Sequence, residues 1–363
     1  MNFQSYKYLF KYFLFLSFLL ISGFQEVKAV SGFPDYDHVV IVAEENHGYA
    51  QIVGSPFAPF INKTLIKGGV LITNAYGEQH PSQPNYFWLF SGSNQGITTD
   101  GPYWPADSGG EPMFSTSNLY VTLEDVFGSN FFGAYVDSGT NTPISDYYVN
   151  TNTYASKHVP WLGFTNINKG NPAGITQDFG TTFSQITDYS TLPKVSWIIP
   201  GLNHDMHSYN NNGTSVNNSI HNAMATSNGD SWLKKNISKY ATWAKTHNSL
   251  LIITWDEDST SDWPTPKKQG GNGINGGVNP EGLTAPNLSF QATASTSGPN
   301  QIAMIFFGDH MKNGKYKLST AVNNINLLRT IEAFYDLTHS GYQSELAIEA
   351  GLTDGPITGI FQP

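Results

Sequence analysis

Two groups of acidic and amide side chains stand directly after apolar runs that span residues 38–43 and 250–255. In an open α/β sheet the carboxyl ends of the strands lie along one edge, where ligands bind. Adjacent carboxylates repel each other, so a buried cluster of them favours a bound cation. The two groups are Glu44-Glu45-Asn46-His47 and Asp256-Glu257-Asp258.

Four residues of these groups carry the oxygen atoms that a hard divalent cation prefers. Glu45 and Asn46 come from the first group, and Asp256 and Glu257 from the second. Carboxylate and amide oxygens suit Ca²⁺, Mg²⁺ or Mn²⁺. We therefore expect one metal site that both groups share. The alternative is that both groups are solvated acids of surface loops.

A candidate nucleophile lies between the two groups, in the segment His80-Pro81-Ser82-Gln83-Pro84-Asn85. Proline is common in the first turn of a helix, so Ser82 is expected at or just before a helix N-terminus. Backbone N–H groups and the helix dipole favour an anion there. A serine at this place can attack phosphorus if its hydroxyl is deprotonated. The alternative is an N-cap serine without a chemical role.

A third polar segment, His204-Asp205-Met206-His207, follows the apolar run 195–199. Its histidines and carboxylate can bind a metal, orient a phosphoryl oxygen or protonate a leaving group. The alternative is that both histidines are ordinary surface residues.

Apolar runs alternate with segments of helical periodicity, which predicts an α/β fold with a mainly parallel sheet and helices on both faces. The expected strands span 38–43, 70–73, 131–136, 195–199, 250–255 and 302–307. The expected helices span 57–66, 84–90, 230–247 and 326–337. Glycine- and asparagine-rich segments at 208–227 and 267–282 are expected to be loops, and the second could cover the site.

Residues 1–29 have the pattern of a secretory signal peptide, with Lys7 and Lys11 before a short apolar run and Ala29 at the expected cleavage site. We therefore expect a secreted or periplasmic protein with one catalytic domain over residues 30–363. The run is shorter than the roughly 20 residues of a membrane span, so no stable membrane insertion is expected.

The chain has 363 residues, no cysteine and a formal net charge of −10. Arg329 is its single arginine. Binding along a nucleic-acid backbone requires clustered lysine and arginine, so no nucleic-acid partner is expected. An anionic substrate must then be neutralised in another way, and a metal cation can do this. The oligomeric state stays open.

The order of these motifs resembles that of the phosphoesterase family, which includes acid phosphatases and bacterial phospholipases C within the alkaline phosphatase superfamily. The resemblance extends from about residue 38 to about residue 337. It implies a metal-dependent phosphoester hydrolase on a three-layer α/β/α sandwich with a mainly parallel central sheet. The matching segments are Glu45-Asn46-His47, His80-Pro81-Ser82-Gln83-Pro84-Asn85-Tyr86, Asp205-Met206-His207 and Thr254-Trp255-Asp256-Glu257-Asp258.

The resemblance also implies roles for single residues. Ser82 resembles the nucleophile that is transiently phosphorylated, and His80 and His207 resemble groups that act on the phosphoryl or leaving oxygen. The residues expected to bind the metal, which would be Ca²⁺, Mg²⁺, Mn²⁺ or Zn²⁺, are Glu45, Asn46, Asp256 and Glu257. The residues expected to bind substrate are Asn85, His204 and Asp205.

One position departs from the family pattern. Many relatives carry a histidine three residues before the paired leucines Leu327 and Leu328, where this chain has Asn324. Its role is then vacant or is taken by His310 or His204. A sulfatase motif would require an arginine after the proline that follows Ser82, and this chain has none there.

The sequence thus predicts a secreted, metal-dependent phosphomonoesterase of the acid phosphatase type with a phosphoserine intermediate. Its expected substrate is a small phosphate monoester or a phospholipid headgroup. A phospholipase C-type phosphodiesterase and a phosphoinositide phosphatase are alternatives with the same motifs. A different class is an extracellular binding protein that has kept the fold and lost catalysis, for which Asn324 is the only support.

Overall fold

The computed structural model describes residues 32–97, 99–100, 113–142, 144–207, 218–259, 300–341, 343 and 352–362. The predicted signal peptide and the loop at 267–282 lie outside the described residues. The loop predicted at 208–227 is described only from residue 218, where it is already helical.

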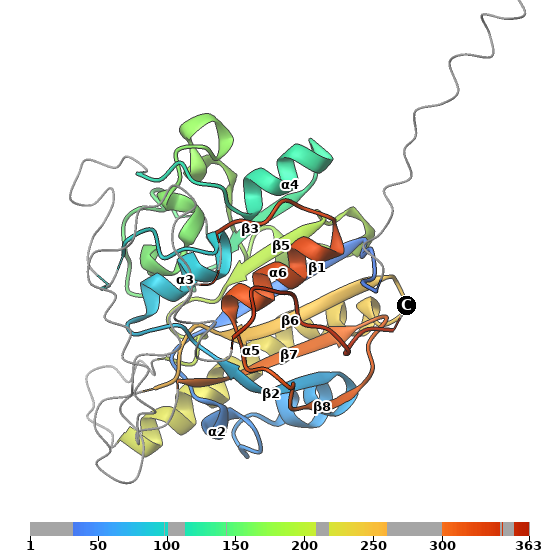
Figure 1. The fold of residues 1–363 in the computed structure, drawn as a ribbon. Helices are drawn as coiled ribbons and strands as arrows, with labels where there is room; N and C mark the ends of the chain where they lie inside the picture. Colours follow the sequence, from blue (N-terminus) through green and yellow to red (C-terminus); the bar gives the residue numbers. More distant parts are fainter. Residues whose placement is uncertain are drawn as a thin grey trace, which may run out of the picture.

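One sheet forms the centre of the fold, with the strand order β4-β3-β5-β1-β6-β7-β2-β8 and with β9 paired to β2 (Figure 1). The strands are β1 (His38–Glu44), β2 (Val70–Tyr76), β3 (Phe132–Val136), β4 (Thr176–Asp178), β5 (Val195–Ile199), β6 (Ser249–Trp255), β7 (Gln301–Gly308), β8 (Gly314–Tyr316) and β9 (Val322–Asn323).

The pairing of the strands is parallel except at β7, which runs antiparallel to both β6 and β2. The prediction of a mainly parallel α/β sheet is therefore confirmed. All six predicted strands are present, with bounds that differ by a few residues at most. The short strands β4, β8 and β9 were not predicted, because two or three residues carry no periodicity that distinguishes a strand.

The α-helices are α2 (Tyr49–Ile52), α3 (Ser82–Ser91), α4 (Leu119–Phe127), α5 (Asn218–Ala244) and α6 (Asn324–Phe334). The helix predicted at 57–66 is instead a π-helix, η1, at Ile61–Ile66. Helix α4 was not predicted, although its ends carry a capping asparagine and a left-handed glycine: Asn118 accepts a hydrogen bond from the Val121 N–H, and Gly128 has φ 67°.

Short 3₁₀ helices connect the elements between β3 and β5. They are η2 (Ser156–His158), η3 (Pro160–Gly163), η4 (Asn168–Gly170), η5 (Pro172–Ile175), η6 (Phe183–Gln185) and η7 (Tyr189–Thr191).

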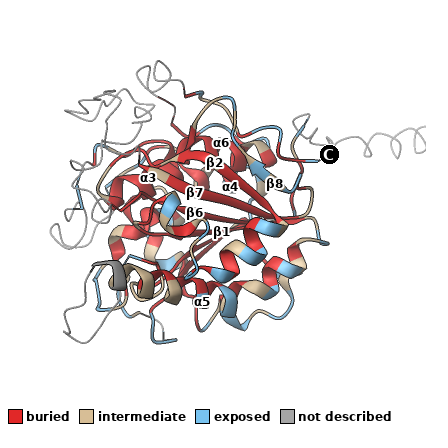
Figure 2. Cartoon of the chain, turned by 90° about the horizontal axis from the view of Figure 1, so that it is seen from below, coloured by how far each residue is buried: buried red, intermediate tan, exposed pale blue. Residues whose placement is uncertain are grey.

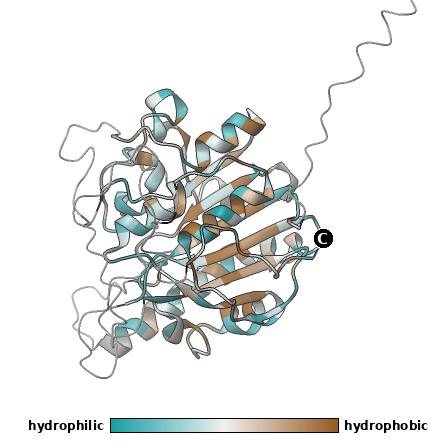
Figure 3. Ribbon diagram, viewed as in Figure 1, coloured by the Kyte–Doolittle hydropathy of each residue, from teal (hydrophilic) through white to brown (hydrophobic). Residues whose placement is uncertain are grey.

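Helices cover both faces of the sheet. Figure 2 shows α5 on one side and α3 and α6 on the other. The strands between them are mostly hydrophobic in Figure 3, and β6 is buried along its whole length. This is the expected pattern for a parallel strand covered on both faces. No helix among the described residues is long and apolar enough to cross a membrane.

Candidate active site

The carboxyl edge of the sheet brings the predicted acidic groups together. Strands β1 and β6 are parallel neighbours, with Glu44 opposite Trp255. The backbone N–H of Asn46 donates to Oδ1 of Asp256 over 2.9 Å. On the other side of β1, the backbone N–H of Glu45 donates to the carbonyl of Asp205 over 2.8 Å. Three segments that are distant in the sequence therefore meet at one edge.

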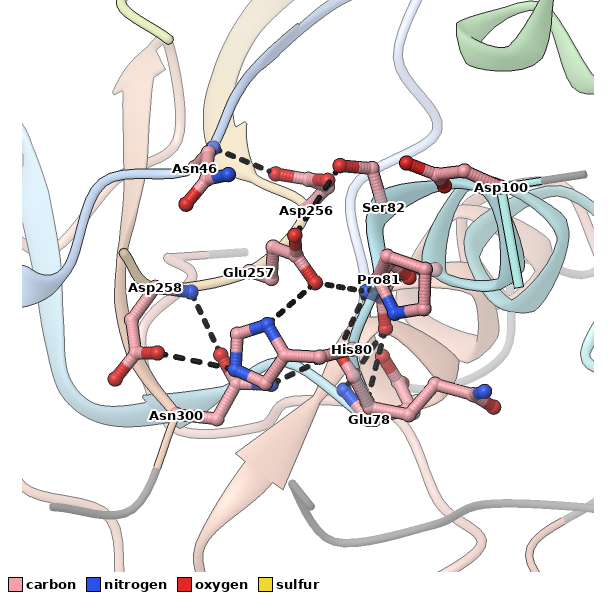
Figure 4. A network of polar contacts seen from close by, with 12 residues as sticks. Asn46, Glu78, His80, Pro81, Ser82, Asp100, Asp256, Glu257, Asp258 and Asn300 are labelled. Atoms are coloured by element: carbon pink, nitrogen blue, oxygen red, sulfur yellow. Dashed lines mark hydrogen bonds and ion pairs between the residues drawn. The ribbon is translucent and has the colours of Figure 1, made fainter. Parts of the chain in front are cut away.

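Ser82 is the first residue of α3, as its position near Pro84 predicts, and its side chain is buried. Its Oγ donates a hydrogen bond to Oε1 of Glu257 over 3.1 Å (Figure 4). Pro81 is the residue before Ser82, and the peptide bond between His80 and Pro81 is cis. Pro81 gives the helix no side-chain cap. Ser82 therefore contacts an acidic group that follows β6 instead of capping its own helix.

Glu257 and Asp258 hold His80 from both sides of its ring. Nδ1 of His80 lies 2.7 Å from Oε2 of Glu257, and Nε2 lies 3.1 Å from Oδ1 of Asp258 (Figure 4). Burial lowers the pKa of His80, but the two carboxylates outweigh it and raise this pKa to about 10. The two carboxylates therefore favour the protonated form of His80. Burial raises the pKa of Glu257 to about 7, although His80 lowers it.

Asn85 fixes the backbone that precedes Ser82. Its Oδ1 accepts from the N–H groups of Glu78 and Gln79, over 3.2 and 3.1 Å, and its Nδ2 donates to the carbonyl of Gln79 over 2.8 Å. Nδ2 also lies 3.3 Å from Oε2 of Glu257. Asn85, which the sequence predicts to bind substrate, thus positions the segment before Ser82, and its substrate-binding role stays a prediction.

Glu45, Asp205 and Asp256 form a group of buried carboxylates without enough donors to satisfy them. All three side chains are at most 2 % exposed. The Oδ2 atoms of Asp205 and Asp256 have no hydrogen-bond partner. Burial and then the charge of Glu45 raise the pKa of both aspartates well above the usual range. A buried, unpaired carboxylate is costly unless a proton or a cation neutralises it.

These groups fit a divalent cation by their chemistry. Glu45, Asn46, Asp256 and Glu257 supply hard oxygen donors at one place, and the buried Oδ2 of Asp256 has no other partner. Among the residues that the structure describes, no group of three or more histidine, aspartate or glutamate side chains is placed so that it could hold a metal ion.

The two predicted histidines of the third segment face different surroundings. His207 is exposed, and its Nε2 lies 3.9 Å from Oε2 of Glu45. His204 lies farther along the edge, where its Nδ1 is 2.6 Å from Oδ2 of Asp137. The structure thus places His207 at the carboxylate group and pairs His204 with an acid that follows β3.

Several residues at the site were not identified from the sequence. Nε2 of His158 lies 3.0 Å from Oε1 of Glu45, and its ring stacks on Tyr86 at 5.0 Å. Lys157 contacts Oδ2 of Asp100 over 2.5 Å. Both belong to the short helix η2, which packs against α3. In the sequence these two residues are only an adjacent Lys-His pair. Such a pair indicates a functional site only when the fold places η2 beside α3.

Asp100 links the same lysine to the nucleophile helix. Its Oδ1 accepts from the N–H of Gln83, the residue after Ser82, over 2.9 Å. Burial lowers the pKa of Lys157. Glu45 and Asp100 together raise it by more than burial lowers it, so this pKa lies above the ordinary lysine value. The ammonium group of Lys157 therefore contacts Asp100 and interacts electrostatically with Glu45.

Asn324, the position that departs from the family pattern, is buried at the start of α6. Its Nδ2 donates to Oε2 of Glu78 over 2.8 Å and lies 3.5 Å from the carbonyl of Asp256. His310 lies at the opposite edge of the sheet beside Tyr36, with ring centroids 5.9 Å apart. His310 therefore does not substitute for a histidine at position 324, and Asn324 itself contacts the backbone of the site.

Comparison with known proteins gives three informative similarities. Residues 56–338 match the model of the phosphoesterase family. The chain is 33 % identical over 314 residues to a phosphatidylinositol-3-phosphatase of Mycobacterium tuberculosis, which covers 86 % of this chain and 82 % of the relative. It is 28 % identical over 211 residues to a phosphate-repressible acid phosphatase of Penicillium chrysogenum, covering 55 % and 44 %.

The fold is similar to that of the lipoteichoic acid synthase LtaP of Listeria monocytogenes, with a TM-score of 0.50, 11 % identity, and coverage of 86 % of this chain and 76 % of that one. At this identity the likeness concerns the fold alone. The family match extends over most of the chain and confirms the resemblance that the motifs carry. This chain belongs to the phosphoesterase family and is a hydrolase that acts on phosphoester bonds.

Proposed function

We propose that this protein is a secreted, metal-dependent phosphomonoesterase that forms a phosphoserine intermediate on Ser82. The observation that carries the proposal is the hydrogen bond from Ser82 Oγ to Glu257, at a helix N-terminus and beside buried carboxylates. The scaffold that we propose is a single domain over residues 30–363, a three-layer α/β/α sandwich of the alkaline phosphatase superfamily. Helices on both faces of the sheet support it (Figure 2).

A divalent cation, Ca²⁺, Mg²⁺, Mn²⁺ or Zn²⁺, would be held by Glu45, Asn46, Asp256 and Glu257. When bound, it supplies positive charge for the phosphoryl oxygens and for the serine oxygen. This positive charge is needed because the ionisable groups nearby are mostly acids, which repel an anionic substrate.

The residues of the chain perform the two bond changes. Ser82 Oγ forms a bond to phosphorus while the bond from phosphorus to the leaving oxygen breaks, and the serine proton passes to Glu257, which already accepts its hydrogen bond. His207 or His80 donates a proton to the leaving oxygen. Water then attacks the phosphoserine and gives a proton to the same histidine, while the bond from phosphorus to Ser82 Oγ breaks. Glu257 returns its proton to Oγ, which restores Ser82 and releases phosphate.

A phosphoinositide phosphatase is the second candidate, because a relative with that activity in its name is 33 % identical over most of both chains.

Secretion is supported by the signal-peptide pattern of residues 1–29. N-terminal sequencing of the exported protein tests it, with cleavage after Ala29 as the expected result.

The test of function uses the purified protein with p-nitrophenyl phosphate and with vesicles that contain phosphatidylinositol 3-phosphate. The expected product is free phosphate in a chelator-sensitive reaction. Release of diacylglycerol from the vesicles would show that the protein is a phospholipase C and not a phosphomonoesterase. No turnover of either substrate across pH values and divalent metals would identify a binding protein that has lost catalysis.

A further inference from the structure

A polar pocket of about 380 Å³ lies next to the candidate active site. One of its walls is a face of α5, whose lining residues are Asn228, Ser231, Trp232, Lys235 and Asn236. Asn228, the pair Ser231 and Trp232, and the pair Lys235 and Asn236 stand one helical turn apart, so they share one face of the helix. This face carries amides, a hydroxyl and an ammonium group. Trp232 is buried, whereas Ser231 and Lys235 are exposed, so the face lies at the boundary between the protein and the solvent.

The opposite wall comes from the loops that follow β3 and β5. Asp137 and Asn141 line it from the first loop, and Asn203 and His204 from the second. Since β3 and β5 are parallel neighbours, both loops lie at the same carboxyl edge as the catalytic groups. The pocket therefore opens along the edge at which ligands bind in α/β sheets.

His204 is held rigidly in this wall. Its Nδ1 lies 2.6 Å from Oδ2 of Asp137, and its ring stacks on Trp232 with centroids 5.9 Å apart and an angle of 21°. Oδ1 of Asp137 accepts from the N–H of Gly139 over 2.8 Å. Nδ1 is thus occupied, which leaves Nε2 as the ring nitrogen that can bond a ligand. A side chain fixed in this way loses little entropy on binding.

The pocket is separate from the catalytic centre. Strand β5 lies between β3 and β1, so Asp137 and Glu45 follow strands whose axes are about 10 Å apart. Asp205, one residue after His204, accepts from the backbone of Glu45. The loop after β5 thus serves the catalytic centre through Asp205 and the pocket through His204.

We propose that this pocket binds a polyhydroxylated ring, such as a hexose or a cyclitol. Ring hydroxyls both donate and accept hydrogen bonds, and asparagine amides offer a donor and an acceptor side by side. Four asparagines line the pocket, whereas its two aromatic residues, Trp232 and Phe179, are buried and pack on each other. Asp137 contacts His204, and Lys235 is the one lysine among the lining residues that the structure describes. A long apolar chain finds no matching surface there.

The test measures binding without turnover, by titration calorimetry or NMR with myo-inositol and methyl α-glucoside as probes. The wild-type protein is expected to bind at least one of them at a single saturable site. Asn236→Leu and Lys235→Ala are expected to weaken it at least about tenfold, which corresponds to about 1.4 kcal/mol. Lys234→Ala is the matched control, because Lys234 is the adjacent lysine of α5, is exposed and does not line the pocket.

Absence of saturable binding in the wild type, or equal affinity in Asn236→Leu and Lys234→Ala, would overturn the proposal. Turnover of p-nitrophenyl phosphate reports on folding and should be unchanged in all three variants. A selective loss of kcat/KM for inositol phosphates in Asn236→Leu would identify the ring as part of the substrate. Lost binding with unchanged kcat/KM for both substrates would identify a separate glycan. Because binding needs no catalysis, failure of the proposed function does not affect this result.

Discussion

Ser82 donates a hydrogen bond to Glu257, which lies 175 positions later in the sequence. The carboxylate of Glu257 also contacts His80, whose other ring nitrogen faces Asp258. Ser82 is therefore linked to a chain of side chains in which His80 lies between two acids. This arrangement fixes the serine oxygen and provides an acceptor for its proton.

Substitution of the nucleophile is the first prediction. Ser82→Ala should lower kcat for p-nitrophenyl phosphate by about a thousandfold or more, roughly 4 kcal/mol in activation free energy, because no covalent intermediate can form. Far-UV circular dichroism and the melting temperature should stay near wild type. Ser91→Ala is the control, a buried serine at the other end of α3. Near-normal turnover by Ser82→Ala would exclude the phosphoserine mechanism.

Removal of the metal is the second prediction. Exhaustive chelation should abolish phosphate release, and one of Ca²⁺, Mg²⁺, Mn²⁺ or Zn²⁺ should restore it. The melting temperature should also fall, because a ligand that binds only the folded state stabilises it. Elemental analysis of the chelated sample is the necessary check. Full activity in a sample shown to be free of metal would contradict the predicted site.

Lys157 gives the third prediction, because its ammonium lies beside Asp100 and is attracted by Glu45. Lys157→Gln should raise the inhibition constant of phosphate about tenfold, the cost of roughly one charged hydrogen bond. Asp100→Asn should leave that constant unchanged or lower it, because asparagine still accepts from Gln83 but no longer binds the ammonium. Lys194→Gln, at the opposite edge of the sheet, is the control. Equal weakening in the two site variants would mean that Lys157 only positions Asp100.

The fourth prediction concerns pH. Burial raises the pKa of Glu78 to about 8, although hydrogen bonds from Asn324 and Ile325 lower it. Between its unfolded pKa, near 4.5, and 8 the folded state therefore binds a proton that the unfolded state has lost. The contribution of Glu78 to the free energy of unfolding must then decrease as pH rises through this range, by about 1.4 kcal/mol for each pH unit.

In Glu78→Gln the free energy of unfolding should fall less steeply as pH rises, because glutamine resembles the protonated acid at every pH. Urea unfolding at about pH 5 and about pH 9 measures the difference, and the variant should be more stable than wild type at the higher pH. Glu124→Gln, on the exposed surface of α4, should keep the wild-type slope. Identical slopes in wild type and Glu78→Gln would show that Glu78 is ionised in the folded protein at neutral pH.

The single arginine of the chain provides the fifth prediction. Arg329 is fully buried and donates to Oε2 of Glu332 over 2.7 Å, to the carbonyl of Ser340 over 3.0 Å and to Oδ1 of Asp354 over 3.2 Å. Arg329→Met should cost about 3–5 kcal/mol in unfolding free energy, because Glu332 is left as a buried, unpaired charge. The double variant Arg329→Met/Glu332→Leu should recover part of it. An unchanged urea midpoint in the single variant would contradict this.

The sequence predicted the elements that carry the site, because each has a local signal. The apolar runs before Glu44 and Asp256 form neighbouring strands, and the proline after Ser82 marks the start of α3. Motif order also predicted the family, which the comparisons confirm. The catalytic and metal-binding roles stay predictions until the experiments above are done.

Other features depended on contacts that periodicity does not encode. Strand β7 runs antiparallel to β6 and β2. The sequence could not predict this direction, because an apolar run has the same pattern in a parallel and in an antiparallel strand. His158 reaches Glu45 only because η2 packs against α3. The pairing of His204 with Asp137 likewise required β3 and β5 to be neighbours.

The sequence by itself therefore determined which residue types stand at the ends of which strands, because hydrophobic spacing and proline position act locally along the chain. The tertiary structure decided which of them touch. It directed Glu257 toward Ser82 and His80, placed Lys157 beside Asp100, and turned His204 into a separate pocket. These outcomes depend on strand order and on side-chain direction, which are set by long-range packing of the whole domain.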